Sequence, residues 1–101
     1  MRIIVFFDLP SVTSSERKEY RSFRKLLLKN GFIMLQESVY SKIALNATVV
    51  NYLIEALRRG KPPNGSIQVL TVTEKQYGKI EFILGEKQTT ILDSDERLVI
   101  L

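Results

Sequence analysis

Six cationic residues lie in one segment, residues 14–29, whose apolar residues recur with the period of an amphipathic helix. On a helical wheel they fall within an arc of roughly 140° that contains no acidic residue. An exposed row of cations without acids is suited to binding the phosphates of a nucleic acid. We call these residues the basic stripe: Arg17, Lys18, Arg21, Arg24, Lys25 and Lys29.

A simpler interpretation of the basic stripe is an ordinary solvated helix face, which is what most charged runs are. Solvated faces usually mix both signs, because opposite charges three or four residues apart stabilise a helix, so the single sign favours phosphate binding. Lys42 is expected to extend the stripe. Arg58, Arg59 and Lys61 could do so too, although cations at the end of a helix also stabilise that helix. No aromatic residue pairs with these cations for base stacking, so we expect binding to the backbone that is indifferent to sequence.

Asp8 is the second candidate, a carboxylate at the end of the apolar segment 2–7. It could form an Asx turn leading to Pro10, or it could be a metal ligand, and the local sequence leaves both open. One carboxylate holds Mg²⁺ poorly, but in a two-fold dimer Asp8 and its symmetry mate would supply two. Such a site could activate water for phosphodiester hydrolysis, with Asp8 as a catalytic residue, or could merely bridge the subunits.

The composition excludes several classes of enzyme, because cysteine and histidine are both absent. Thiol nucleophiles, Ser-His-Asp triads and Cys/His zinc sites cannot be formed. The lack of cysteine fits a reducing compartment, and the apolar run 3–7 is too short for a signal peptide or a membrane span. We therefore expect a cytoplasmic protein, and its net charge of +4 favours acidic partners.

A strand and a helix must position Asp8 and the basic stripe. Residues 2–7 are apolar on both faces, which predicts a central strand buried on both sides. Thr13 and Glu16 have the spacing of a capping box, and Gly31 is a typical C-terminal stop, so a helix is predicted over about 14–29.

The rest of the chain predicts more strands and a second helix. Residues 32–43 predict two short strands or one long bent strand. Asn46 can cap a helix that ends at Gly60 and buries Val49, Val50, Leu53, Ile54 and Leu57. Further strands are predicted at 67–72, 80–84 and 98–101.

This order predicts an α+β fold, a ferredoxin-like βαββαβ sandwich with an additional C-terminal strand, in a single domain over residues 1–101. Two helices would cover one face of the sheet, and the other face is too apolar to remain in water. We therefore expect a homodimer stacked through the sheets. The last apolar strand needs an edge to pair with, which places four residues at the dimer interface: Leu98, Val99, Ile100 and Leu101.

Several segments resemble the CRISPR-associated (Cas) protein two family along nearly the whole chain. They are the strand ending in Phe7-Asp8, the basic helix beginning near Arg17, and the more specific stretch Gln36-x-Ser38-Val39-Tyr40. Longer segments, including Leu70-Thr71-Val72-Thr73-Glu74-Lys75-Gln76, are similar to the branch found in type II-A systems.

The resemblance implies a ferredoxin-like homodimer at the centre of the spacer-acquisition complex of CRISPR adaptation. It would bind foreign duplex DNA between dimers of a partner integrase, which performs the strand transfer. Asp8 matches the family's metal-binding aspartate, and members are commonly classed as Mg²⁺-dependent endonucleases acting on RNA or DNA, an activity that is not uniform across the family. Three hypotheses follow: a DNA-binding scaffold, a free-standing Mg²⁺-dependent endoribonuclease, and a regulatory or interaction module on the same fold. The third ranks last because few convergent polar residues suggest a ligand pocket.

Overall fold

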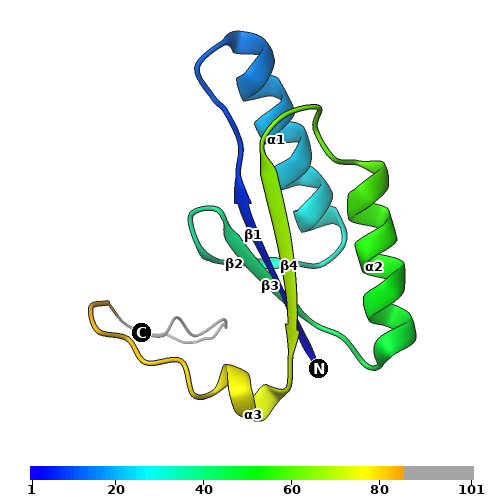
Figure 1. The fold of residues 1–101 in the computed structure, drawn as a ribbon, viewed down its shortest axis with the longest axis vertical. Coiled ribbons are helices and arrows are strands. Elements are labelled where there is room, and N and C mark those ends of the chain that lie inside the picture. Colours follow the sequence, from blue (N-terminus) through cyan, green and yellow to red (C-terminus); the bar gives the residue numbers. More distant parts are fainter. Residues whose placement is uncertain (86–101) are drawn as a thin grey trace, which may run out of the picture.

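The structure, a computed structural model, describes residues 1–85, and the strand predicted at 98–101 lies outside them. Figure 1 shows the arrangement of the elements. Their bounds are β1 Arg2–Asp8, α1 Ser14–Lys29, β2 Ile33–Gln36, β3 Val39–Ile43, α2 Ala47–Arg59, β4 Ser66–Val72 and α3 Glu74–Tyr77.

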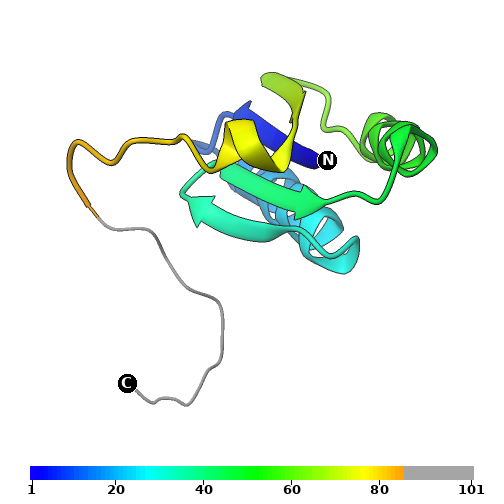
Figure 2. The ribbon, with the colours of Figure 1, turned by 90° about the horizontal axis from the view of Figure 1, so that it is seen from below.

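The four strands form one antiparallel sheet in the order β2-β3-β1-β4. In Figure 1, α1 passes behind β4, and α2 lies to the right of β4. In Figure 2, where α2 is seen nearly along its axis, the short helix α3 lies well away from it. The predicted βαββαβ order and the α+β class are therefore confirmed.

The core fills the space between the sheet and the two long helices. Ile3, Val5 and Phe7 point from β1 toward the helices, since alternate residues of a strand share a face. Their partners on the helices are buried: Phe23 and Leu27 on α1, and Val50, Leu53 and Leu57 on α2, the last three as predicted. Val49 and Ile54, which were also predicted to be buried, are partly buried. Each fully buried side chain of this kind contributes about 1.5–3 kcal/mol to folding.

The opposite face of the sheet, which we call the open face, carries the other residues of β1. Here the prediction of a strand buried on both sides is only half right, because Ile4 is 7% exposed but Phe6 is 37% exposed. The helices cover one face alone, so the apolar residues of the open face have much less protein above them. Among the described residues, no helix is long and apolar enough to cross a membrane.

The predicted ends of α1 and α2 are also confirmed. The Thr13 hydroxyl accepts the N–H of Glu16, and the Glu16 carboxylate accepts the N–H of Thr13 in return. The bond from the Thr13 N–H lowers the pKa of Glu16 below its ordinary value, because it stabilises the charged carboxylate. Asn46 caps α2 through the N–H of Val49, and Gly60 follows the last helical residue.

Residues 32–43 form two short strands rather than one bent strand. β2 and β3 pair as a hairpin whose register shifts between Met34 and Gln36, as in a β-bulge. Ser38 has a positive φ of 68° in the turn. The hairpin places Tyr40 opposite Val5, on the helix-covered face.

The strand predicted at 80–84 is wrong. Residues 80–85 have no regular secondary structure, and the chain after β4 instead forms the short helix α3. The physical reason is a second capping box, in which Thr73 and Gln76 exchange hydrogen bonds of 2.9 and 3.0 Å. Ile80 and Phe82 of this segment line a hollow on the open face, where they need no strand pairing, whereas Ile83 and Leu84 are 92% and 94% exposed.

Gly65 allows the loop before β4 to pack closely against the end of β1. Its φ is +110°, and a Cβ at this position would lie 2.8 Å from the carbonyl oxygen of Asp8. Gly85 has a similar φ of +93° but has nothing within 4 Å of the same position. Replacing each glycine by alanine therefore separates two free-energy costs: that of a side chain on a left-handed backbone, which both positions have, and that of a Cβ too close to Asp8, which only Gly65 has.

We expect Gly65→Ala to lower the free energy of unfolding more than Gly85→Ala does, by at least ~1 kcal/mol, when both are measured by urea denaturation. Gly85→Ala alters only the backbone preference, whereas Gly65→Ala must also push the Asp8 backbone aside. Equal losses for the two variants would show that the contact with Asp8 contributes nothing.

Candidate nucleic-acid interface

The basic stripe lies on the exposed side of α1. All six of its residues are exposed, because Phe23 and Leu27 turn the opposite side of the helix into the core. From Arg17 to Lys29 the stripe runs about 18 Å along the helix axis, which is roughly the rise of five base pairs of duplex DNA.

No acidic side chain of residues 1–85 forms an ion pair with the stripe. The salt bridges within this part of the chain join Arg2 to Glu74 at 2.8 Å and Arg58 to Glu55 at 3.1 Å. Asp8 and Glu37 border the same hollow as Arg17 and Arg21 but form no ion pair with them, so the stripe remains available to an external anion.

Two of the stripe's arginines are held by hydrogen bonds to the protein. A terminal nitrogen of Arg17 donates to the carbonyl of Val12, in the loop before α1. The Nε of Arg24 donates to the hydroxyl of Tyr40 at 2.9 Å. Both bonds orient a guanidinium group without neutralising its charge.

Lys42 lies beside the C-terminal end of α1, as a continuation of the stripe requires. Its Nζ is 2.7 Å from the position that a Cβ on Gly31 would take, and its side chain is half-buried. A cation here also interacts favourably with the carbonyl end of the helix. Arg58, Arg59 and Lys61 are exposed at the end of α2, a separate helix.

Asp8 is exposed at the end of β1, opposite Ser66 of β4. Among the described residues its carboxylate accepts no hydrogen bond, so the Asx turn leading to Pro10 is not formed. Asp8 instead borders an open hollow of about 410 Å³ together with Arg17 and Arg21 of the stripe. The structure thus brings the two candidate sites together at one end of α1.

The sequence did not predict this proximity, because it depends on how the loop 9–13 returns the chain from β1 to α1. The same hollow is lined by Glu37 and Ser38 of the β2–β3 turn. The only sequence signal for it was the shortness of that loop, which keeps the start of α1 near the end of β1.

A magnesium ion has few ligands here from one chain. Within residues 1–85 there is no group of three or more carboxylates that could hold a metal. Mg²⁺ can be held by one or two carboxylates while it keeps several waters, so Asp8 fits as one of its ligands but does not complete a site alone. A second copy of Asp8 is the source of a further carboxylate that the sequence suggested.

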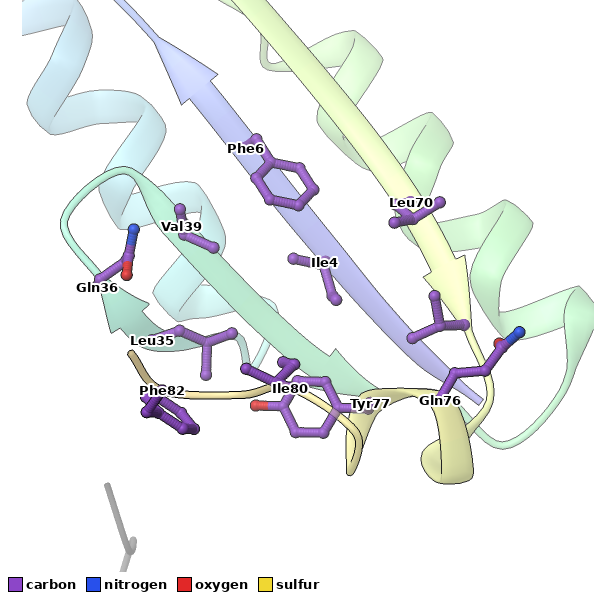
Figure 3. Close-up of a pocket in the computed structure, with 11 residues that line it drawn as sticks. Ile4, Phe6, Leu35, Gln36, Val39, Leu70, Gln76, Tyr77, Ile80 and Phe82 are labelled. Carbon is purple, nitrogen blue, oxygen red and sulfur yellow. The ribbon is translucent and has the colours of Figure 1, made fainter. Parts of the chain in front are cut away.

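The open face of the sheet carries an apolar hollow of about 480 Å³ (Figure 3). Its side chains come from all four strands, from α3 and from the segment after α3, and they lie on the side of the sheet away from α1 and α2. Prominent among them are Phe6, Leu70, Tyr77, Ile80 and Phe82.

Comparison with known proteins identifies relatives along the whole chain. The family model described as CRISPR associated protein Cas2 matches residues 1–80. A Treponema denticola protein named CRISPR-associated endoribonuclease Cas2 is 55% identical over 101 residues, which is all of both chains. A Streptococcus mutans serotype c protein of the same name is 50% identical over all of this chain and 93% of its own length.

A solved structure supports the fold independently. The crystal structure of Streptococcus pyogenes Cas2 at pH 6.5 matches with a TM-score of 0.65, covering 84% of this chain and 100% of that chain. Its sequence identity is 22%, so this likeness bears on the α+β fold alone. With the family model and the curated relatives, the conclusion is that this chain belongs to the CRISPR-associated protein Cas2 family.

Proposed function

We propose that this protein is a dimeric scaffold of CRISPR adaptation in the cytoplasm, of the type II-A branch, which binds foreign duplex DNA through its phosphate backbone. It does so within a complex with a partner integrase, which joins the DNA. The observation that carries the proposal is the basic stripe, an exposed row of cations on α1 with which no acidic residue of the described chain forms an ion pair.

The chemistry of the stripe suits a duplex of any sequence. Arginine and lysine bind phosphate oxygens and release condensed counterions, which supplies affinity without reading the bases. The stripe's length allows contact with several successive phosphates, and Lys42 extends it beyond the end of α1. A protein that must accept DNA of foreign origin needs this indifference to sequence.

The dimer in this proposal forms through the open face. Phe6 and Leu70 both line the hollow of Figure 3 on this face, and they are 37% and 51% exposed. Stacking two such faces would remove apolar surface from water at about 25 cal/mol per Å². The basic stripes would then lie on the outer sides of the pair, because α1 covers the other face of the sheet.

We expect the triple variant Arg17→Gln, Arg21→Gln and Arg24→Gln to bind a fluorescent duplex more weakly, with a flatter dependence on salt. The slope of log K against log salt should fall by about 0.9 for each phosphate contact that is lost. Anisotropy titrations at several salt concentrations measure both quantities.

The matched control for this triple variant is Arg58→Gln, Arg59→Gln and Lys61→Gln, which removes the same charge from the end of α2. We expect it to retain most of the parent's slope. If both triple variants lose the same slope, net charge alone governs binding, and if the first variant keeps the parent's slope, the stripe is only a solvated face.

The dimer is tested by placing a charge on the open face. We expect the parent to scatter light with twice the 11.6 kDa mass of one chain, and Leu70→Glu to scatter with the mass of a monomer. Leu45→Glu is the control, since Leu45 is 86% exposed and lies between β3 and α2. A dimer that tolerates Leu70→Glu as well as Leu45→Glu would contradict stacking through this face.

A metal-dependent endoribonuclease is the second candidate function. Two observations favour it: the Treponema denticola and Streptococcus mutans relatives are named endoribonucleases, and Asp8 is exposed beside Arg17 and Arg21. In this alternative Asp8 holds Mg²⁺ with the second copy's Asp8, and the arginines hold the phosphate of the substrate.

Asp8→Asn should abolish Mg²⁺-dependent cleavage of RNA or duplex DNA if this second function is present, because an amide lacks the negative charge that attracts the ion. Binding of the duplex should remain within about twofold of the parent, as no cation is removed. Cleavage that survives the substitution would assign the activity to another site or to a contaminant.

A further inference from the structure

Tyr40 has no role in the functions considered so far, yet it is one of the most deeply buried large residues of the chain. It is 1% exposed, and its ring packs at 5.7 Å from the ring of Phe7 in the core. β3 fixes its backbone between β1 and β2, where it pairs with Val5 and Met34. The position of its hydroxyl is therefore set by the core and not by solvent.

The Tyr40 hydroxyl forms a hydrogen bond with a residue of the basic stripe. It accepts a hydrogen bond of 2.9 Å from the Nε of Arg24, a bond that is partly buried although Arg24 itself is exposed. The bond uses only one of the five N–H groups of the guanidinium. The two terminal nitrogens keep the donors that bind a phosphate with two parallel bonds.

An exposed arginine normally loses much of its rotational freedom when it binds an anion, and this loss weakens binding. Arg24 has already lost part of that freedom, because a buried acceptor holds its Nε. The other long cations of the central stripe, Lys18, Arg21 and Lys25, have no hydrogen bond or ion pair with residues 1–85 that would fix them in the same way. Arg24 is thus the central cation of the stripe whose orientation the core determines.

We propose that Tyr40 is a positioning residue that holds Arg24 in place as a preset phosphate contact at the centre of the basic stripe. This inference rests on the proposed function, since it assigns a role in binding the same duplex. It adds that, among the central cations of the stripe, Arg24 is the one that a hydrogen bond within residues 1–85 orients, and that this orientation originates in the aromatic core around Phe7.

The experiment is a double-mutant cycle between Tyr40→Phe and Arg24→Gln, with duplex affinity measured at fixed salt. Phenylalanine keeps the ring in the core and removes only the acceptor. We expect Tyr40→Phe alone to weaken binding about three- to tenfold, as the loss of one hydrogen bond would, with no change in the salt slope because no charge is removed. In the Arg24→Gln background, Tyr40→Phe should have no further effect.

The matched control is Tyr52→Phe, which removes a hydroxyl from an exposed tyrosine of α2 and should leave the affinity unchanged. A second readout, the NMR signal of the Arg24 Nε–H, should be protected from exchange with water in the parent and lose its protection in Tyr40→Phe. The variant Arg24→Lys provides a third readout. Lysine keeps the positive charge, but its single ammonium group cannot bind the Tyr40 hydroxyl and also make two parallel hydrogen bonds to a phosphate. We therefore expect Arg24→Lys to weaken duplex binding as Tyr40→Phe does. This variant leaves Tyr40 unchanged and tests the inference even if Tyr40→Phe unfolds.

Several results would overturn the inference. One is a duplex affinity equal to that of the parent in Tyr40→Phe or in Arg24→Lys. Another is that Tyr40→Phe lowers the duplex affinity by the same factor in the parent and in the Arg24→Gln background. If the parent binds the duplex with a steep salt dependence in these cases, the proposed function stands and only the role of Tyr40 fails. If the parent does not bind duplex even at low salt, the proposed function itself fails.

Discussion

The packing of Phe7 is the contact on which the rest of this structure depends. Its ring meets Tyr20 and Phe23 of α1 edge-on, at 5.8 and 5.2 Å, and meets Tyr40 of β3 at 5.7 Å. Edge-to-face pairs of this kind add about 0.5–1.5 kcal/mol each beyond the burial of their area. One side chain therefore fixes how α1 lies across the sheet, and with it the direction in which the basic stripe faces. The next residue is Asp8, so the same packing holds the candidate metal ligand beside the start of the stripe.

The features that the sequence predicted well are those that depend on local spacing. Thr13 and Glu16 cap α1, and Asn46 caps α2, because a cap needs only a side chain that reaches the N–H groups of the next turn. The exposure of the stripe follows from the period of the helix, because Phe23 and Leu27 on its opposite side are buried in the core. The segment 80–84 failed for the opposite reason. Its apolar residues matched the pattern of a strand, but a strand also needs the edge of another strand to pair with, which local sequence does not show. The Thr73–Gln76 capping box begins the helix α3 immediately after β4.

The candidate site could be predicted in its parts but not in its arrangement. Asp8 and Arg17 were each recognisable from residue type, whereas their common hollow depends on the path of the loop 9–13. The bond between Arg24 and Tyr40 was less accessible still, since it joins residues 16 positions apart through the packing of α1 on β3. In the sequence, Tyr40 belonged to the stretch that resembled the family, and Arg24 to the stripe, with nothing to connect them.

The distribution of charge decides which face of the molecule can meet a second copy. Cations of the stripe cover α1, and burying them against a like-charged helix would cost the desolvation of each charge with no opposite charge to offset it. The open face has the opposite character, because its apolar residues lose contact with water at little cost in hydrogen bonds. Arg2 emerges at its margin, but its guanidinium is paired with Glu74 at 2.8 Å and lies 4.0 Å from the centre of the Tyr77 ring. The guanidinium that lies over the Tyr77 ring is therefore already paired within the chain, which leaves the open face suited to stacking and the stripe free for an anion.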